Sequence, residues 1–162
     1  MKSEIKKINL EEESYSIMTN NPFENFSYLR AMEESGSASE TSGWIPDHLG
    51  EIENKKLISF MPLYKKFNSY GEFIFDHQWA NALQRAGRSY YPKLLTAIPF
   101  TPCEGDRILA KNKKNKFNLI DAGIRKMEME QIESWHILFP NEDCKTILRD
   151  KNFIERLNYR FT

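Results

Sequence analysis

Residues 68–105 read NSYGEFIFDHQWANALQRAGRSYYPKLLTAIPFTPCEG, and the fold class follows from the pattern of this stretch. Residues 70–75 (YGEFIF) predict a strand. Residues 76–86 predict a short helix that Asp76 can cap. Residues 93–98 (KLLTAI) predict a buried strand, and the prolines that follow it end that strand. A strand, a helix and a second strand in succession favour an α/β protein.

The residues before this stretch predict a strand and then a helix. Residues 3–9 (EIKKINL) favour the first strand. Asn21 offers an N-cap and Pro22 sits at the first helical position, so a helix is expected from there to Gly36. The small polar residues that follow, up to Ser42, predict a loop.

A β-hairpin is predicted next. Residues 48–53 and 57–65 flank Asn54-Lys55-Lys56, a sequence typical of a tight turn. Because Pro62 cannot donate to a sheet ladder, we expect a bulge or an early strand end at that position.

After the quoted stretch the pattern alternates again. A basic loop, residues 107–116, precedes an expected helix over residues 117–132. Residues 134–139 (SWHILF) predict a strand, Asn141 caps a further helix, and residues 158–162 predict the start of another strand. The whole order predicts a mixed central sheet flanked by helices.

Length and charge set limits on function. The chain has 162 residues, with 23 Lys plus Arg against 23 Asp plus Glu. This length predicts a single lobe over residues 1–162. The zero net charge argues against a dedicated nucleic-acid binder. No apolar run approaches the roughly 20 residues that span a bilayer, and no secretory signal is visible, so we expect a cytoplasmic protein.

Several familiar kinds of site are not indicated. Cys103 and Cys144 lack the spacing of a zinc site, and two thiols make no disulfide framework. No Ser-His-Asp arrangement, P-loop or metal-ligand spacing is visible in the sequence. We therefore expect no metal and no permanently bound cofactor.

Acid–base candidates gather around the first predicted helix. His77 could act as a general base if its pKa is near neutral, and Asp76 could either orient it or simply cap the helix. Glu72 is a second candidate base. His136, on a predicted central strand, is either a core residue or part of a site.

Aromatic and basic residues supply binding candidates. Tyr90, Tyr91 and Lys93 form a cluster that could stack on a sugar, a nucleobase or a peptide, although buried tyrosines often serve the core. The basic loop runs into the start of the helix expected at residue 117. A helix N-terminus with basic residues can hold an anion, but a solvated lysine loop is the alternative.

The quoted stretch also resembles a known family signature. It is similar to a bacterial family of N-acyltransferases labelled peptidoglycan biosynthesis/recognition proteins, related to the Fem aminoacyltransferases of the GNAT superfamily. The matching pieces are Ser69-Tyr70-Gly71-Glu72, Phe75-Asp76-His77, Trp79-Ala80, Ala86-Gly87, Tyr90-Tyr91-Pro92-Lys93-Leu94 and Pro99-Phe100-Thr101-Pro102. Asn21-Pro22-Phe23 and Ser134-Trp135-His136 also look like the family.

The resemblance implies a fold and an activity. It implies a GNAT-like sheet that transfers an acyl or aminoacyl group to an amine, with acyl-CoA or aminoacyl-tRNA as co-substrate and a small amine or a peptidoglycan precursor as acceptor. Backbone N–H groups at Ile98 or Phe100, between strands that splay apart, would hold the acyl carbonyl. The alternative is a non-catalytic lobe that binds a cell-wall precursor or a partner protein.

The candidate residues fall into three groups. The expected catalytic residues are His77, Glu72 and Asp76. The expected substrate-binding residues are Trp79, Tyr90, Tyr91, Lys93, Phe100, Thr101 and His136, and the expected cofactor-binding residues are Gly105, Arg107, Lys113 and Lys114.

Two features depart from the family pattern. The phosphate-cradle sequence of acetyl-CoA enzymes, Q/R-x-x-G-x-G/A, is replaced by Gly105-Asp106-Arg107. Family members are also more than twice as long, so the chain is expected to be an N-terminal portion, apparently truncated at its C-terminus. Its open sheet edge would then need a second lobe or a dimer partner.

Overall fold

The computed structural model describes residues 3–10, 19–74 and 76–157, apart from the side chain of His77. The helical elements are a 3-10 turn at Pro22–Glu24, α1 (Phe26–Glu34), α2 (His77–Arg85), α3 (Lys113–Glu130) and α4 (Glu142–Arg149). The strands are β1 (Glu4–Lys7), β2 (Trp44–Pro46), β3 (Leu49–Glu53), β4 (Lys56–Met61), β5 (Tyr64–Lys66), β6 (Lys93–Thr96), β7 (Leu109–Ala110) and β8 (Trp135–Ile137).

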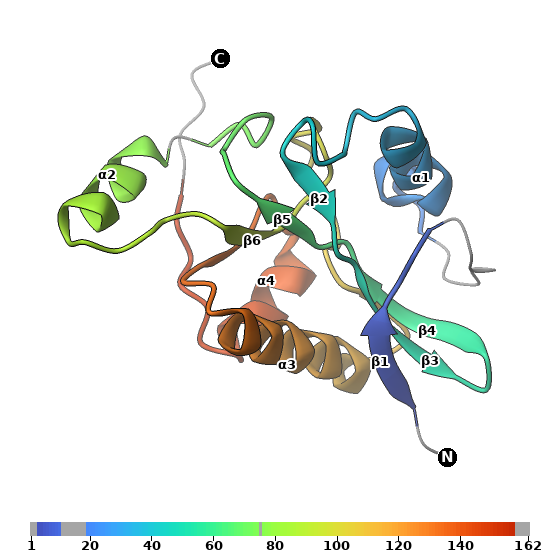
Figure 1. The fold of residues 1–162 in the computed structure, drawn as a ribbon. Helices are drawn as coiled ribbons and strands as arrows, with labels where there is room; N and C mark the ends of the chain where they lie inside the picture. Colours follow the sequence, from blue (N-terminus) through green and yellow to red (C-terminus); the bar gives the residue numbers. More distant parts are fainter. Residues whose placement is uncertain (1–2, 11–18, 75, 158–162) are drawn as a thin grey trace.

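The strands form two four-stranded sheets that are halves of one broken sheet (Figure 1). One sheet has the order β1-β3-β4-β7 and is antiparallel. The other has the order β2-β5-β6-β8, with only β6 and β8 parallel. Along the chain, the connections from β2 to β3, from β4 to β5 and from β6 to β7 each pass from one sheet to the other. The expected mixed central sheet is therefore present but interrupted.

Pro62 marks the break between the two sheets. The strand expected over residues 57–65 ends as β4 at Met61 and restarts as β5 at Tyr64, which confirms the early end expected there. Across the break, the N–H of Asp47 donates to the Leu63 carbonyl at 2.8 Å. The N–H of Leu63 donates to Nδ1 of the buried His48 at 3.0 Å. The His48 side chain thus accepts from the Leu63 N–H in place of a backbone carbonyl.

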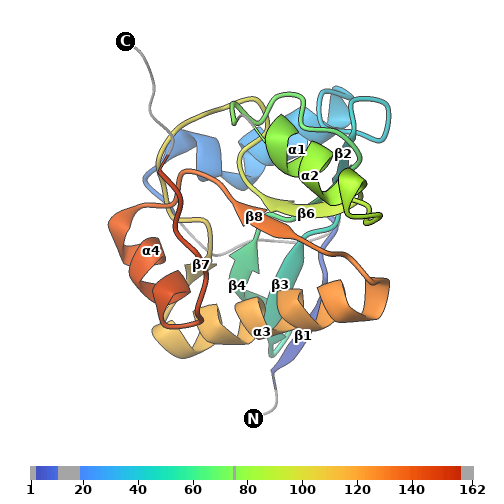
Figure 2. The same ribbon diagram turned by 90° about the vertical axis from the view of Figure 1, so that its left-hand side faces the viewer.

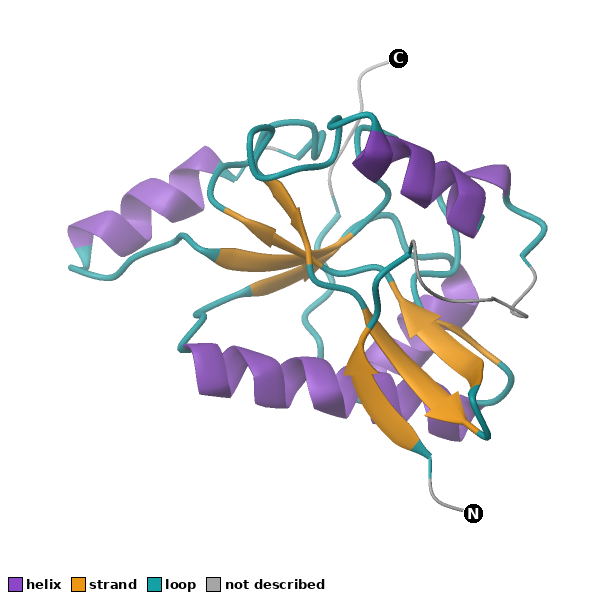
Figure 3. Cartoon of the chain, turned by 45° about the vertical axis from the view of Figure 1, so that its right-hand side comes forward, coloured by secondary structure: helices purple, strands orange, loops and turns teal. Residues whose placement is uncertain are grey.

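Helices cover both faces of the strands (Figures 2 and 3). The core beneath α3 and α4 joins Leu119 and Leu148 to residues such as Met61 from the strands. On the opposite face, Leu29 of α1 packs with Phe60 and other apolar residues. No described helix has the length and apolar character needed to cross a membrane.

The first expected helix is divided in two. Asn21 caps Pro22–Glu24 as expected, since its side chain accepts from the Phe23 N–H. Asn25 then adopts an extended conformation and caps α1 anew. The hairpin of β3 and β4 is confirmed, with Asn54 and Lys55 both at positive φ in its turn.

Two other expectations were wrong in part. Residues 70–74 form a turn instead of the expected strand, since Gly71 and Phe73 have positive φ, which an extended strand does not allow. The long helix begins at Lys113, four residues before the expected start, because Asn112 caps it by accepting from the Asn115 N–H. The strand expected at 158–162 lies outside the described residues.

The mixed α/β class is confirmed. The strands expected at 93–98 and 134–139 are β6 and β8, and α2 and α4 occupy the places expected for them. The short strands β2 and β7 were not anticipated, because two or three residues carry too little pattern to detect. The placement of this fold in the GNAT superfamily stays a prediction.

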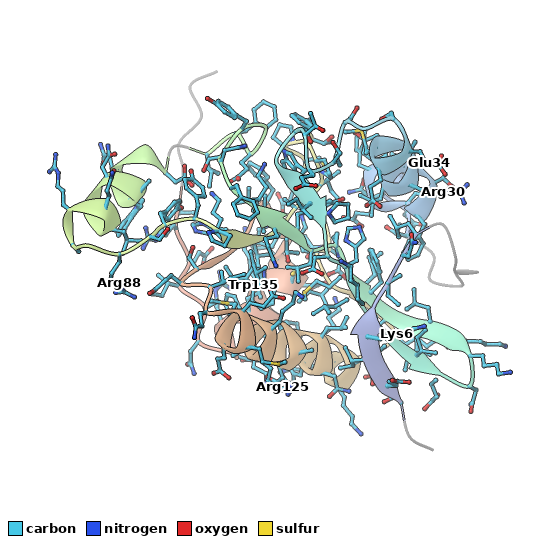
Figure 4. The ribbon with its side chains drawn as sticks, viewed as in Figure 1. Lys6, Arg30, Glu34, Arg88, Arg125 and Trp135 are labelled. Carbon is cyan, nitrogen blue, oxygen red and sulfur yellow. The ribbon has the colours of Figure 1, made fainter. Side chains whose placement is uncertain are left out.

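We predict that Gly123→Ala destabilises the fold. A Cβ at this position of α3 would lie 2.5 Å from the ring of Trp135, a residue of β8 that lies next to α3 (Figure 4). Alanine has a higher helix propensity than glycine, so the substitution by itself should stabilise α3. A loss of about 1–3 kcal/mol in the free energy of unfolding would therefore come from the steric clash with Trp135. Urea denaturation measures it. The control is Met129→Ala on the same helix, where the side chain is exposed and little change is expected.

Candidate functional site

Two buried lysines face each other across the second sheet. Lys66 of β5 and Lys93 of β6 are register partners, and both are 0% exposed. Like charges directly opposite on neighbouring strands repel one another, and burial adds a large desolvation cost. The pair therefore requires negative charges close by.

The loop after β5 supplies those charges. Lys93 Nζ donates to Glu72 Oε2 at 2.8 Å and to Asp76 Oδ2 at 2.5 Å. Lys66 Nζ lies 3.9 Å from Glu72 Oε1. Ser69 connects Lys93 to Asp76, because its hydroxyl accepts from Lys93 Nζ at 2.8 Å and donates to Asp76 Oδ2 at 2.7 Å. We call these five residues (Lys66, Ser69, Glu72, Asp76 and Lys93) the charge cluster.

The charge cluster also fixes the backbone of the loop. The Tyr70 carbonyl accepts from Lys66 Nζ at 3.1 Å and from Trp44 Nε1 at 3.0 Å. Lys66 Nζ lies 4.0 Å from the centroid of the Trp44 ring, a cation–π contact. The loop at residues 67–74 is thus anchored at Tyr70 by buried side chains of β2 and β5, and at Ser69 and Glu72 by Lys93 of β6.

Burial changes the acidity of the charge cluster. Desolvation lowers the pKa of Lys66 to about 8; the nearby Glu72 opposes this change, and the charge of Lys93 adds to it. Burial raises the pKa of Glu72 despite its contact with Lys93. Burial alone would also raise the pKa of Asp76. Hydrogen bonds from Lys93, Ser69 and Tyr90 outweigh this effect, so the pKa of Asp76 is lowered.

A hydrogen-bonded chain connects the charge cluster to β8. The Tyr90 hydroxyl donates to Asp76 Oδ2 at 2.7 Å and lies 3.2 Å from His136 Nε2. A phenol has one proton, so His136 Nε2 must donate to Tyr90, which leaves Nδ1 as the unprotonated nitrogen. Burial, reinforced by the charge of Lys93, lowers the pKa of His136 to about 4, so the imidazole is neutral at pH 7.

One carboxylate oxygen of Asp76 is left without a hydrogen-bond partner. Asp76 is 3% exposed, and its Oδ1 has no hydrogen-bond partner among the described residues. The same residue lines a groove with a volume of about 1000 Å³. A buried, unpaired carboxylate oxygen costs free energy unless a donor reaches it. Asp76 therefore brings to the lining of the groove a carboxylate whose Oδ1 can still accept an N–H or O–H donor.

The groove runs between α2, β8, α4 and the segment after α4. Tyr90 and His136 line it beside Asp76. At its outer end the Arg156 guanidinium lies 3.8 Å from the centroid of the Trp79 ring. Its lining includes four cationic residues, Lys145, Arg149, Lys151 and Arg156, and four acidic residues, Asp76, Glu104, Glu133 and Glu155. Because β8 is an edge strand of its sheet, the groove lies along the open edge where a partner was expected.

The strands β6 and β8 separate next to this groove. They pair as far as Thr96, whose carbonyl accepts from the Leu138 N–H at 3.0 Å. Beyond that point β8 continues beside Gly105 instead, which donates its N–H to the Phe139 carbonyl at 3.1 Å. Residues 97–104 turn away between the two strands, with Phe100 at positive φ. The backbone donors expected at Ile98 and Phe100 lie in this turn, and their role stays a prediction.

The structure brings together six of the ten residues expected to be catalytic or substrate-binding. Glu72, Asp76, Lys93, Tyr90 and His136 are joined as described, and Tyr91 joins them through a 2.7 Å hydrogen bond to Ser69. The hydroxyls of Tyr90 and Tyr91 are both engaged inside the protein, and the stacking expected of their rings stays a prediction. Asp76 precedes α2, but its side chain makes no capping hydrogen bond, so that alternative was wrong.

The remaining candidates lie elsewhere or serve the fold. The backbone of His77 begins α2, and its side chain lies outside the described part of the chain. Thr101 hydrogen-bonds Tyr28 of α1 at 2.9 Å. Phe100 is partly exposed beside Trp44, at a centroid distance of 5.5 Å.

The anion site expected before α3 needs correction. Arg107 is fully buried and donates to the carbonyls of Leu138 and Cys103 and to Glu24, so its guanidinium is committed to structure. Gly105 is required by packing, because a Cβ there would lie 1.7 Å from Glu24 Oε1.

The two lysines expected in the same loop lie on the first turn of α3. Lys113 pairs with Asp150 of α4 at 2.7 Å, and Lys114 is exposed. Their position favours a solvated lysine surface over a phosphate cradle.

Sequence reasoning missed Lys66, Ser69 and Trp44 as parts of the site. Lys66 carried a signal, since a lysine at the buried end of an otherwise apolar strand needs a counter-charge. That signal required the break at Pro62 to be placed correctly, because the break determines which face Lys66 occupies.

The fold and site define an α/β protein with a groove at an open sheet edge and a buried acid–base network facing it. A family model described as peptidoglycan biosynthesis/recognition matches residues 4–162. The chain belongs to this FemAB-like family, which confirms the resemblance seen in residues 68–105. Comparisons with curated proteins and with solved structures gave no match.

We predict that Glu72→Gln strongly destabilises the protein. Removing one partner of a buried ion pair leaves uncompensated charge, here on Lys66 and Lys93, at a cost of about 3–5 kcal/mol. The matched control is Glu133→Gln, which removes an exposed pair with Arg88 and should cost less than about 1 kcal/mol. Urea denaturation at pH 7 measures both.

The pH dependence of this variant gives a second readout. Lys66 binds its proton less tightly in the folded than in the unfolded chain, so the stability of Glu72→Gln should rise between pH 7 and pH 9 as this lysine loses its charge. Equal unfolding midpoints for Glu72→Gln and Glu133→Gln would contradict the assigned role of the charge cluster.

Proposed function

We propose that the protein is an N-acyltransferase that transfers an acyl or aminoacyl group to an amine in peptidoglycan-related metabolism. The observation that carries this proposal is the unpaired Oδ1 of Asp76, a residue that lines the groove together with the neutral His136. Membership of a family described as peptidoglycan biosynthesis/recognition supports the choice of a cell-wall precursor as acceptor.

Asp76 binds the acceptor amine. Its Oδ2 already accepts from Lys93, Ser69 and Tyr90, which fixes the orientation of the carboxylate. Oδ1 is then directed at a ligand, and an amine N–H is a donor that matches it. A charge-assisted hydrogen bond of this kind is stronger than a neutral one and also orients the nitrogen lone pair.

His136 receives the proton released in the reaction. As the amine nitrogen bonds to the acyl carbon, its N–H becomes acidic enough for a weak base to remove. The bond from the acyl carbon to the donor's oxygen or sulfur breaks, and the same proton passes from His136 Nδ1 to that leaving group. The low pKa of His136 suits both steps, because the imidazole starts neutral and releases the proton readily.

Glu72 and Lys93 act as positioning residues in this proposal. They are fully or almost fully buried and hold Asp76 and Ser69 in place. Glu72 is already paired with Lys66 and Lys93, so we assign the role of base to His136 instead of Glu72. Backbone N–H groups in residues 97–104, where β6 and β8 separate, would stabilise the oxyanion.

The donor is an activated ester or thioester with an anionic carrier, either aminoacyl-tRNA or acyl-CoA. Arg156, whose guanidinium lies against the Trp79 ring at the groove, supplies a cation for such a carrier. Both carriers belong to the cytoplasm, where the proposal places the reaction.

The test is a transfer assay with a lysine-containing, cell-wall-type peptide as acceptor and either donor. Asp76→Asn should raise KM for the amine and lower kcat, whereas His136→Gln should lower kcat with little effect on KM. We expect each to reduce kcat/KM by at least about 100-fold.

Asp143→Asn is the matched control, since Asp143 is exposed on the first turn of α4. It should retain activity. If no donor gives transfer but the peptide binds in an Asp76-dependent way, the catalytic proposal fails and a non-catalytic binding lobe replaces it. Full activity of both site variants would contradict the proposed site.

A further inference from the structure

The helix α2 lies apart from the body of the protein. It is at the periphery of the fold in two views, away from the other helices (Figures 1 and 3). None of residues 78–89 is buried, and only Ala80 and Leu83 among them are partly buried. A helix of nine residues is too short to be stable alone in water, and such helices are normally stabilised by packing an apolar face. The apolar face of α2 is therefore expected to meet a partner surface.

That apolar face consists of Trp79 and Leu83. The two residues lie four positions apart, so their side chains share one side of the helix. Both line the groove, and Trp79 is 51% exposed. The face thus borders the groove while much of the Trp79 ring remains in solvent.

The two ends of the segment that carries α2 are fixed at one point. Asp76 precedes the helix and Tyr90 follows it, and both residues are buried. The Tyr90 hydroxyl donates to Asp76 Oδ2 at 2.7 Å, and Lys93 of the charge cluster donates to the same oxygen. Surface segments whose ends meet in this way are compact units and are frequently functional. We call residues 78–89 the flap, and Asp76 with Tyr90 its base.

Beyond the base, little holds the flap against the body. Arg88 pairs with Glu133, which precedes β8, but both side chains are exposed, and an exposed ion pair contributes little stability. The helix ends at Gly87, where no atom of the described residues lies within 4 Å of a Cβ placed on that glycine. The flap therefore has space in which to move.

The segment after α4 contributes a second apolar surface to the lining of the groove. Phe153 anchors this segment, because its ring packs edge-on against Trp135 at a centroid distance of 5.3 Å. Ile154 and Leu157 line the groove and are 82% and 76% exposed. Residues 154–157 make no backbone–backbone hydrogen bond with any other described residue. Apolar side chains in this position gain free energy when another apolar surface covers them.

One contact already joins the two surfaces. The Arg156 guanidinium lies 3.8 Å from the centroid of the Trp79 ring, a cation–π contact. Because Arg156 lies between Ile154 and Leu157 in the chain, this contact brings the apolar face of α2 close to both of them. The flap thus touches the segment through a cation, whereas the apolar side chains of the segment remain in solvent.

We infer that the flap is a lid on the groove, which closes when Trp79 and Leu83 pack on Ile154 and Leu157. The base serves as the hinge, and the contact between Arg156 and Trp79 aligns the two surfaces. The lid rests on the geometry of the flap and the groove. Its use, the exclusion of water that would compete with the amine for the acyl group, rests on the proposed function.

The test is ¹⁵N relaxation dispersion of the tryptophan indole N–H groups in the ligand-free protein. Lids close on the microsecond-to-millisecond timescale, which this method detects. The Trp79 signal, assigned with Trp79→Phe, should show an exchange contribution. Trp44 is the internal control and should show none, because it is buried and its Nε1 donates to the Tyr70 carbonyl at 3.0 Å.

The double variant Ile154→Ser/Leu157→Ser removes the surface on which the lid closes. The exchange contribution at Trp79 should fall at least about tenfold, since the population of the closed form depends on burying both side chains. Both are exposed in the observed form, so a merely structural role predicts no change. Met129→Ser is the matched control, because Met129 is 84% exposed on α3. It should leave the exchange at Trp79 as in wild type.

Three results would overturn the inference. They are the absence of exchange at Trp79 in wild type, equal exchange in the double variant, and exchange that grows with protein concentration, which would show that α2 docks on a second molecule. Amine transfer is measured separately. Closure of the lid without transfer refutes only the proposed function, and transfer by a protein whose α2 does not move refutes only the lid.

Discussion

The structure depends on two lysines that the sheet places opposite each other in its interior. Lys66 and Lys93 could not share this position without Glu72 and Asp76, which the loop between β5 and α2 brings against them. Replacing a buried ion pair by apolar residues is often neutral for stability, so the charges are better explained by what they position than by the stability they provide. They fix one loop, and that loop presents a carboxylate to the groove and aromatic rings to the surface.

The break in the sheet makes this arrangement possible. An unbroken strand over residues 57–66 would continue one ladder, whereas Pro62 ends β4 and lets β5 pair anew with β2 and β6. On the other side of β6, β8 leaves its partner after Thr96 and continues beside Gly105. Both interruptions leave backbone and side chains free to form a site at one end of the sheet, next to the groove.

The sequence predicted the elements better than it predicted the contacts. Long, periodic segments such as α3, and strands bounded by proline such as β6, were identified because burial imposes a regular pattern on them. The turn at residues 70–74 was mistaken for a strand, since its alternation of aromatic and polar residues reflects exposed rings and buried charges instead of two faces of a sheet. The family signature identified Asp76, Tyr90 and His136, but only the register of β5 and β6 shows that Lys66 completes the charge cluster. Arg107 looked like a phosphate ligand because sequence does not reveal burial.

The central claim is that Lys66 is buried among these charges with a lowered pKa. A pH titration of the protein carrying ε-¹³C-labelled lysine, followed by NMR, measures this most directly. We expect a lysine signal with a midpoint near 8, the value for Lys66, and the loss of that signal in Lys66→Arg. If every lysine instead titrates near the ordinary value of about 10.4, the lowered pKa of Lys66 is contradicted.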